Sequence, residues 1–246
     1  MGFVATVGDV FIFLFRILIT AFKRPHRIKL FLKEFEFSGT QSLPIILVTS
    51  SFTGMVFSLH SSYAFGLFKA ETLVGPSVAL SLIRELGGVL TALMVAGRVG
   101  SAYSAQIGSM KVTEQIDALH SMAVNPIHYL AVPKALALFL ATPMLYIIFI
   151  GLGLLGGFFV AVTAGDIPSG LFWRDIPRFV KIKDLWVGIL KSSVFGVIIA
   201  TISCYFGFKV EGGAEEVGKA STKSIVTNSI LIFLTNFIIS SMFFAR

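Results

Sequence analysis

Charged residues and cysteine are both scarce in this sequence of 246 residues. Only 13% of the residues are charged, against about 25% in soluble domains, while 55% are hydrophobic and the mean hydropathy is +0.87. The single cysteine, Cys204, cannot form an internal disulfide, so the fold does not depend on oxidation. This composition excludes disordered, collagen-like and disulfide-scaffold classes and indicates a polytopic membrane protein.

The sequence contains several long apolar runs. A spanning helix needs about 20 predominantly apolar residues, and five stretches of the sequence meet this requirement. The second stretch contains Arg84 and Glu85, and the fourth contains Lys191 near its start. We therefore predict an all-α membrane protein with five transmembrane helices, at residues 43–68, 72–99, 135–165, 185–208 and 224–245.

The apolar N-terminal segment has a different pattern. On a helix, the polar residues of this segment would share one face, and the large apolar residues would occupy the other faces. The polar residues are Asp9, Arg16, Thr20, Lys23 and Arg27. The large apolar residues are Phe11, Ile12, Phe15, Leu18, Ile19 and Phe22. This pattern is typical of an amphipathic helix in the membrane interface, with a sixth span as the alternative. A cleaved signal peptide is disfavoured, because the basic residues follow the apolar run.

The basic residues also predict an orientation. Six of them precede the first predicted span, namely Arg16, Lys23, Arg24, Arg27, Lys29 and Lys33, which places the N-terminus in the cytoplasm. Five spans then leave the C-terminus on the outer, periplasmic side. The net charge of +7 favours contact with anionic lipid headgroups over nucleic acid, because the basic residues cluster beside apolar segments. We expect one domain, 1–246, with an interfacial segment 1–42 and a five-span bundle 43–246.

A polar segment, residues 97–126, separates the second and third predicted spans. Within it Val112, Ile116, Leu119 and Ala123 recur at helical spacing, and Asn125-Pro126 is typical of a helix end. A short amphipathic helix is therefore expected here. Taken alone, the residues leave two interpretations open, a docking element for a partner protein and a helix lying on the membrane.

Two glycine-rich motifs resemble nucleotide-binding sequences without their context. The pattern G-x-G-x-x-G at 151–156 lies inside an uncharged stretch of 31 residues, where no strand–turn–helix unit is expected. Gly153 and Gly157 instead form a G-x-x-x-G pair, which predicts close helix packing. The segment 213–219 ends in Lys219 like a P-loop, but Ala220 stands where a hydroxyl must bind magnesium. We therefore predict that this chain binds no ATP by itself.

Arg84 and Glu85 are the most informative pair in the sequence. An ionised side chain at the centre of a bilayer costs about 2.5–3.5 kcal/mol on insertion scales, so such residues usually face a partner or a cavity. Neighbouring residues on a helix point about 100° apart, so at least one of the two must reach another helix, subunit or ligand. Both a structural ion pair and a polar element of a translocation cavity fit this pattern. No catalytic or metal-binding pattern is found among the four histidines and the single cysteine.

Four segments together resemble the MlaE (YrbE) family of ABC transporter permeases. They are residues 79–102 around Arg84-Glu85, 110–119, 122–126 and 212–223, and the resemblance covers about residues 35–246. The sequence departs from the family pattern at Gly88, where proline is usual, and at Asn125, where aspartate is usual.

The resemblance implies the MlaE-type ABC permease fold in a homodimer in the bacterial inner membrane. Such permeases move phospholipids between that membrane and a tunnel of MCE-domain proteins, and so act on lipid asymmetry. The partners implied are a cytoplasmic ABC ATPase, which binds the ATP and Mg, an MCE-domain ring and often a STAS-domain protein. No cofactor is implied for this chain. The helix at 112–122 would be the coupling helix, contacting the ATPase through Val112, Glu114, Ile116, Asp117 and Leu119.

The resemblance also implies an outward-facing lipid pocket at the dimer interface. Its lining in this sequence would be Phe57, Phe65, Phe68, Arg84, Glu85, Leu86 and Lys191. Two other functions remain open. A stand-alone secondary transporter or channel would use Arg84 and Glu85 as an intramembrane ion site, and a scaffold for MCE proteins would need neither charge.

Overall fold

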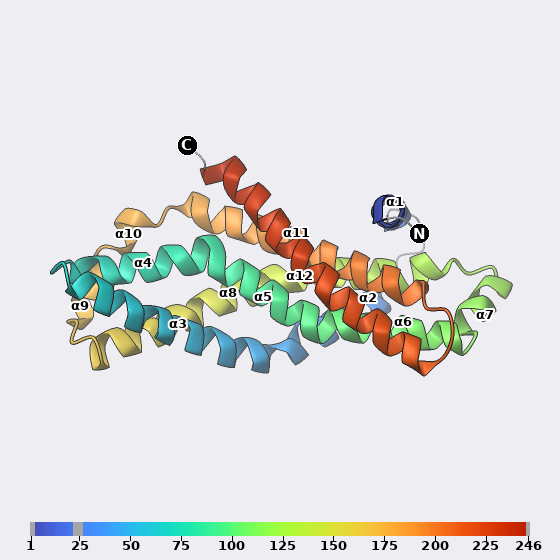
Figure 1. Cartoon of the computed structure of the whole chain (residues 1–246), viewed down its shortest axis with the longest axis horizontal. Helices are drawn as coiled ribbons and strands as arrows, with labels where there is room; N and C mark the ends of the chain where they lie inside the picture. Colours follow the sequence, from blue (N-terminus) through green and yellow to red (C-terminus); the bar gives the residue numbers. More distant parts are fainter. Residues whose placement is uncertain (1–2, 22–26, 245–246) are drawn as a thin grey trace. The chain divides into compact units, whose positions relative to one another are not determined.

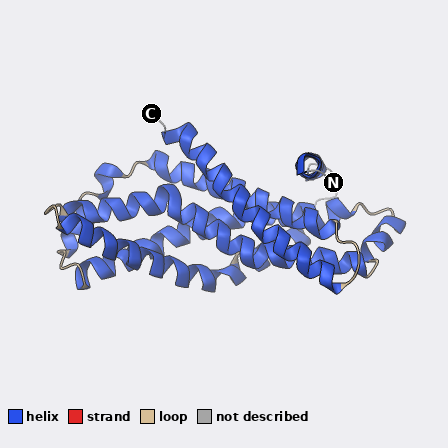
Figure 2. Cartoon of the chain, viewed as in Figure 1, coloured by secondary structure: helices blue, strands red, loops and turns tan. Residues whose placement is uncertain are grey.

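The computed structural model describes residues 3–21 and 27–244, and these are helical almost throughout, with no strand among them (Figure 2). The predicted all-α fold is confirmed. Phe22 and Lys23 of the predicted N-terminal helix, and Arg24 of the basic residues that predict the orientation, lie outside the described residues.

Figure 1 labels the α-helices in chain order. Short 3₁₀ segments at Thr40–Ser42 and Glu71–Leu73 and π-helical segments at Leu82–Leu86, Ala96–Gly100 and Ile127–Ala131 connect several of them. The α-helices are α1 (Phe3–Ala21), α2 (Ile28–Ser38), α3 (Leu43–Gly66), α4 (Val74–Ser81), α5 (Gly87–Val95), α6 (Ser101–Val112), α7 (Gln115–Ser121), α8 (Val132–Thr163), α9 (Ser169–Arg174), α10 (Ile176–Phe179), α11 (Ile182–Phe208) and α12 (Ala214–Phe244).

Five helical runs in the described part of the chain are long and apolar enough to span a membrane, as predicted. They are Ile28–Gly66, Glu71–Val112, Ile127–Thr163, Ile182–Phe208 and Ala214–Phe243. The helix of the second predicted span extends beyond residue 99, because the π segment Ala96–Gly100 continues directly into α6. The polar segment 97–126 is therefore largely a continuation of the spanning helix.

The chain forms two compact units, each assembled from separate parts of the sequence. The first unit consists of Met1–Ser42, Ala92–Thr142 and Ser193–Thr235, and the second of Leu43–Thr91, Pro143–Ser192 and Asn236–Arg246. Several long helices contribute one part to each unit, so the units are not successive domains along the chain.

In the second unit, glycines bring α3 and α8 into backbone contact. A Cβ atom at Gly54 of α3 would overlap the carbonyl oxygen of Gly153 in α8, and one at Gly157 would lie 3.2 Å from the Gly54 oxygen. Because lipid tails are as apolar as leucine, such close approach is a main source of helix association in membranes. The predicted packing role of Gly153 and Gly157 is confirmed.

In the first unit, α1 packs against the C-terminal end of α11. The Phe13 ring lies 6.0 Å from that of Tyr205 and 5.8 Å from that of Phe208, and the Asp9 carboxylate accepts a 2.7 Å hydrogen bond from Lys209. On its other side α1 leaves Phe11 and Phe15 66% and 64% exposed. This apolar outer side fits the predicted interfacial helix.

The placement of Arg27 on the face of that helix was wrong, because the backbone of Arg27, with φ of −92° and ψ of 68°, is not helical. Arg27 instead precedes α2, and its guanidinium carbon lies 4.5 Å from the centre of the Tyr129 ring.

Two cations hold α2 and the segment after it within the first unit. The buried Lys134 ammonium donates to Glu34 at 2.7 Å and to Gln106 at 2.8 Å. Arg98 donates to the Phe37 carbonyl at 3.0 Å and to the Ser42 hydroxyl at 2.8 Å. Protein oxygens therefore accept hydrogen bonds from both cations.

Because α3 and α8 are in backbone contact at Gly54, a single added methyl group should disturb the packing there. We expect Gly54→Ala to reduce stability by about 1–3 kcal/mol, because the added methyl must displace backbone rather than a movable side chain. Unfolding of the purified chain in detergent measures the loss. Gly66→Ala, on the same helix with no atom within 4 Å of the added Cβ, is the matched control. Equal stability of the two variants would contradict the proposed contact.

Candidate functional site

Arg84 and Glu85 lie in the π-helical segment Leu82–Leu86 of the second unit. A π segment inserts a wider turn into an α-helix and leaves local backbone carbonyls without their usual partners. In a membrane an unsatisfied carbonyl costs several kcal/mol, so side chains of neighbouring helices must supply donors.

Two side chains supply those donors. The Tyr146 hydroxyl of α8 donates to the Ile83 carbonyl at 2.6 Å, and the Lys191 ammonium of α11 donates to the Arg84 carbonyl at 2.8 Å. Gly188 makes room for the first bond, because a Cβ atom there would overlap the Tyr146 hydroxyl. The π segment is thus held in register by α8 and α11.

The Arg84 side chain pairs with Asp184 near the start of α11. Its Nε and Nη2 atoms each lie 3.0 Å from Asp184 Oδ1, and the other carboxylate oxygen accepts the Lys181 backbone N–H at 2.9 Å. A carboxylate in the first turn of a helix is also favoured by the helix dipole. Asp184 therefore fixes the arginine and caps its own helix.

The Glu85 carboxylate pairs with Lys191 and with two polar residues of α12. Lys191 lies 3.2 Å and 3.3 Å from its two oxygens, Asn236 donates at 2.7 Å and Ser240 at 2.8 Å. The Lys191 ammonium also lies 2.6 Å from the Ser240 hydroxyl. As expected for adjacent residues, Arg84 and Glu85 reach different partners, and both partners are on other helices.

Burial is unequal within these two ion pairs. The Lys191 and Asp184 side chains are only 1% and 3% exposed, whereas those of Glu85 and Arg84 are 42% and 36% exposed. Buried residues of α11 therefore hold two charged groups at the surface of the unit. Arg84 and Glu85 together form a charged edge, which presents a fixed cation and a fixed anion to a polar ligand.

The other residues of the predicted lipid pocket are more dispersed. Phe57 and Phe65 are half-buried on α3, Leu86 is half-buried at the end of the π segment, and Phe68 is 80% exposed in the turn after α3. Among the predicted lining residues, hydrogen bonds join Glu85 and the Arg84 carbonyl to Lys191. The lining role of the three phenylalanines remains a prediction.

Sequence reasoning did not identify Asp184, Tyr146, Asn236 and Ser240 as members of this site. Asp184 and Lys191 are seven residues apart, which is two helical turns, so their shared face was a usable signal. Asn236 and Ser240 are four residues apart in the last predicted span, and that spacing also gives one face.

The predicted coupling helix begins later than expected. Val112 ends α6, the chain turns at Thr113 and Glu114, and α7 begins only at Gln115. Glu114 adopts the left-handed backbone conformation with φ of 59°, which no continuous helix contains. The predicted helix from 112 to 122 is therefore wrong at its start.

The turn also changes which residues of this region face outward. Ile116 is buried inside the first unit, so its predicted place on an exposed apolar face beside Val112 is wrong. Leu119 is half-buried. Val112, Glu114, Asp117 and Met122 are exposed, and Asp117 bridges back to Lys111 at 3.1 Å.

The P-loop-like segment forms the first turns of α12. The Lys219 ammonium lies 2.9 Å from Glu215 and 2.7 Å from Glu216. In a P-loop the corresponding lysine contacts nucleotide phosphates. Here two carboxylates occupy that position.

The Lys191–Glu85 contact predicts a measurable coupling energy. We expect Lys191→Met to destabilise the chain by about 1–3 kcal/mol, because Glu85 and the Arg84 carbonyl each lose a charged donor. Combined with Glu85→Gln, the loss should be smaller than the sum of the single losses by about 1 kcal/mol. Unfolding in detergent measures both values.

Lys181→Met, which removes an exposed lysine ten residues earlier, should change stability by no more than about 0.5 kcal/mol. Strict additivity of the Lys191 and Glu85 variants would show that the two side chains do not interact.

Several relatives are similar to this chain over most or nearly all of its length. A "Probable ABC transporter permease protein" of Rickettsia conorii is 39% identical over 98% of this chain and 93% of its own length. One of the same description from Synechocystis is 40% identical over 87% of this chain and 81% of its own length. The "Intermembrane phospholipid transport system permease protein MlaE" of Haemophilus influenzae is 37% identical over 99% of this chain and 94% of its own length.

The match to a family model agrees with these relatives and with the five apolar helices. The family model is described as Permease MlaE, and it matches residues 31–242. The chain therefore belongs to the MlaE family of ABC transporter permeases, multi-pass proteins of the inner membrane.

Proposed function

We propose that this permease moves phospholipids between the bacterial inner membrane and a tunnel of MCE-domain proteins. The Haemophilus relative is named as a phospholipid transport permease, which supports this substrate class. The transporter would be a homodimer, with a separate ATPase binding ATP and Mg and, where present, a STAS-domain protein. The N-terminus would lie in the cytoplasm and the C-terminus in the periplasm.

The observation that carries the proposal is the exposed charged edge formed by Arg84 and Glu85. A phospholipid such as phosphatidylethanolamine has a phosphate and an ammonium group a few bonds apart. Arg84 would contact the phosphate and Glu85 the ammonium, while Asp184 and Lys191 keep both side chains in place. Phe57, Phe65, Phe68 and Leu86 would contact the acyl chains.

The carboxylate contacts argue against the alternative of a stand-alone ion transporter or channel. Glu85 accepts hydrogen bonds from Lys191, Asn236 and Ser240, so three donors already occupy positions that a bound cation would need. An ion site of this kind would have to break those bonds during each cycle. Headgroup binding at the exposed side of the carboxylate leaves them intact.

The contact with the ATPase would be made by α7 and the turns at its two ends. Val112 and Met122 provide exposed apolar surface, and Glu114 and Asp117 provide exposed carboxylates. Ile116 would support this surface from inside the unit, because its side chain is on the buried side of α7. Leu119, half-buried, would lie at its edge.

Transport should depend on Arg84. In proteoliposomes that contain the partner ATPase and MCE protein, we expect Arg84→Gln to reduce ATP-dependent phospholipid transfer by about tenfold or more, because a charge-assisted contact with the phosphate is lost. Arg178→Gln, at an exposed arginine of α10, should keep the original rate. Transfer without the ATPase would favour the secondary transporter, and transfer unaffected by Arg84→Gln would favour a scaffold.

Assembly should depend on the turn before α7. Reversing the exposed charge in Glu114→Lys should weaken capture of the ATPase by about tenfold, the usual size of a lost charged contact at an interface. Glu71→Lys, at the other end of the helical run Glu71–Val112, is the control and should bind normally. Equal capture by both variants would place the ATPase elsewhere on the permease.

A further inference from the structure

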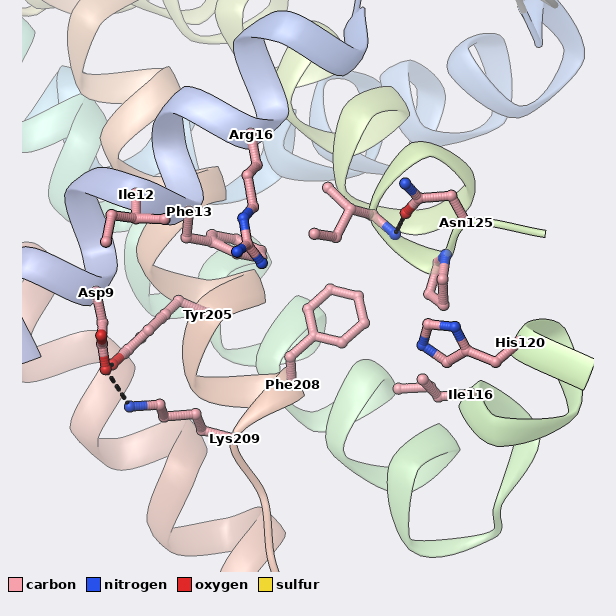
Figure 3. Close-up of a pocket in the computed structure, with 12 residues that line it drawn as sticks. Asp9, Ile12, Phe13, Arg16, Ile116, His120, Asn125, Tyr205, Phe208 and Lys209 are labelled. Atoms are coloured by element: carbon pink, nitrogen blue, oxygen red, sulfur yellow. Dashed lines mark hydrogen bonds and ion pairs between the residues drawn. The ribbon is translucent and has the colours of Figure 1, made fainter. Parts of the chain in front are cut away.

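A cavity of about 450 Å³ lies in the first unit, whereas Arg84 and Glu85 belong to the second. Its walls come from α1, α7, the segment 125–127 and the C-terminal end of α11 (Figure 3). Much of the lining is apolar, with Ile12 and Phe13 from α1, Ile116 from α7 and Phe208 from α11. The volume and lining suit a hydrocarbon chain.

Arg16 gives this apolar cavity a positive charge. Its side chain extends from α1 toward the centre of the cavity, between the Asp9–Lys209 pair and the His120–Asn125 side (Figure 3). Within residues 3–21 and 27–244 the Arg16 guanidinium has no hydrogen bond or ion pair. Its charge is therefore available to a ligand.

The one carboxylate in the lining is already neutralised. Asp9 accepts a hydrogen bond from Lys209 at 2.7 Å, and that bond and the lysine charge hold the pKa of Asp9 below its ordinary value. The same hydrogen bond raises the pKa of Lys209, so both groups stay ionised at neutral pH. The lining is thus positive overall and offers no free anion for a ligand ammonium group.

A second hollow adjoins the first. It has a volume of about 530 Å³ and shares Arg16, His120, Asn125 and Ile127 with the first, adding Thr20 and the backbone turn at Ala123 and Val124. Arg16 therefore stands between two spaces, one largely apolar and one bordered by polar groups.

The exposed apolar side of α1, with Phe11 and Phe15, suits contact with lipid. An interfacial position of α1 would place the cavity at the depth of the headgroups and the upper parts of the acyl chains. We propose that the cavity binds an anionic phospholipid, with its phosphate on Arg16 and an acyl chain against Ile12, Phe13 and Phe208. A zwitterionic lipid fits less well, because no free carboxylate faces its ammonium group.

Binding here would join α1 to α7 through a lipid. The phosphate would be held from α1, and the chain would pack beside Ile116 of α7. This site lies in a different unit from the charged edge formed by Arg84 and Glu85, and its binding test needs neither the ATPase nor transport.

The test is photocrosslinking from inside the cavity. The full chain, with benzoylphenylalanine replacing Phe208, is placed in nanodiscs that contain labelled phosphatidylglycerol or labelled phosphatidylcholine at equal fractions. We expect phosphatidylglycerol adducts to exceed phosphatidylcholine adducts by about tenfold, because both phosphates can reach Arg16 but only phosphatidylcholine brings an ammonium group into the positive lining. Equal labelling by the two lipids would overturn the proposal.

Three further measurements separate this site from general attraction to anionic membranes. Arg16→Gln should reduce the phosphatidylglycerol adduct to the phosphatidylcholine level, whereas Lys29→Gln, at an exposed lysine of α2, should leave it unchanged. Ile12→Trp should reduce both adducts by filling the cavity. An adduct insensitive to Arg16→Gln, or one abolished by excess glycerol phosphate, would overturn the proposal, the second in favour of a soluble phosphate ligand.

Discussion

The second unit is organised around one buried ammonium group, that of Lys191. A charge with 1% exposure is tolerated only where acceptors surround it, and here they come from the Arg84 carbonyl, the Glu85 carboxylate and the Ser240 hydroxyl. These acceptors lie in the π segment and in α12, whereas Lys191 belongs to α11. The requirement to satisfy one cation therefore fixes the register of three helical segments and, with them, the direction in which Glu85 points.

The sequence was sufficient to predict five spans and the need of Arg84 and Glu85 for partners on other helices, because the transfer cost of a side chain follows from its residue type and its place in the span. It was not sufficient to name those partners. Asp184 stood just outside a predicted span, and Asn236 is one of two asparagines in the last predicted span, with nothing in the sequence to distinguish it from Asn228. The π segment was also not predictable, because it depends on donors that tertiary packing brings to Ile83 and Arg84.

The region before α7 shows a different limit of sequence patterns. Periodicity placed Val112 and Ile116 on one apolar face, but it does not distinguish residues that face the protein's own core from those that face a partner. The left-handed conformation of Glu114 separates the two residues, and Ile116 enters the unit while Val112 stays exposed. Glutamate has no special preference for the left-handed conformation, so the residue type at position 114 does not predict the turn.

The cations of this permease differ in their hydrogen-bond partners, and this difference separates those that hold helices together from those proposed to bind a ligand. In the first unit, Lys134 and Arg98 donate to protein oxygens on or near α2, so their charges are used in holding helices together. In the second, Arg84 is held by a buried carboxylate but keeps an exposed side. Arg16 represents the third case, a cation aimed into an apolar cavity whose carboxylate is already paired with Lys209. A membrane lipid can supply the missing anion and fill the apolar space at the same time, and neither water nor a soluble ion can do both.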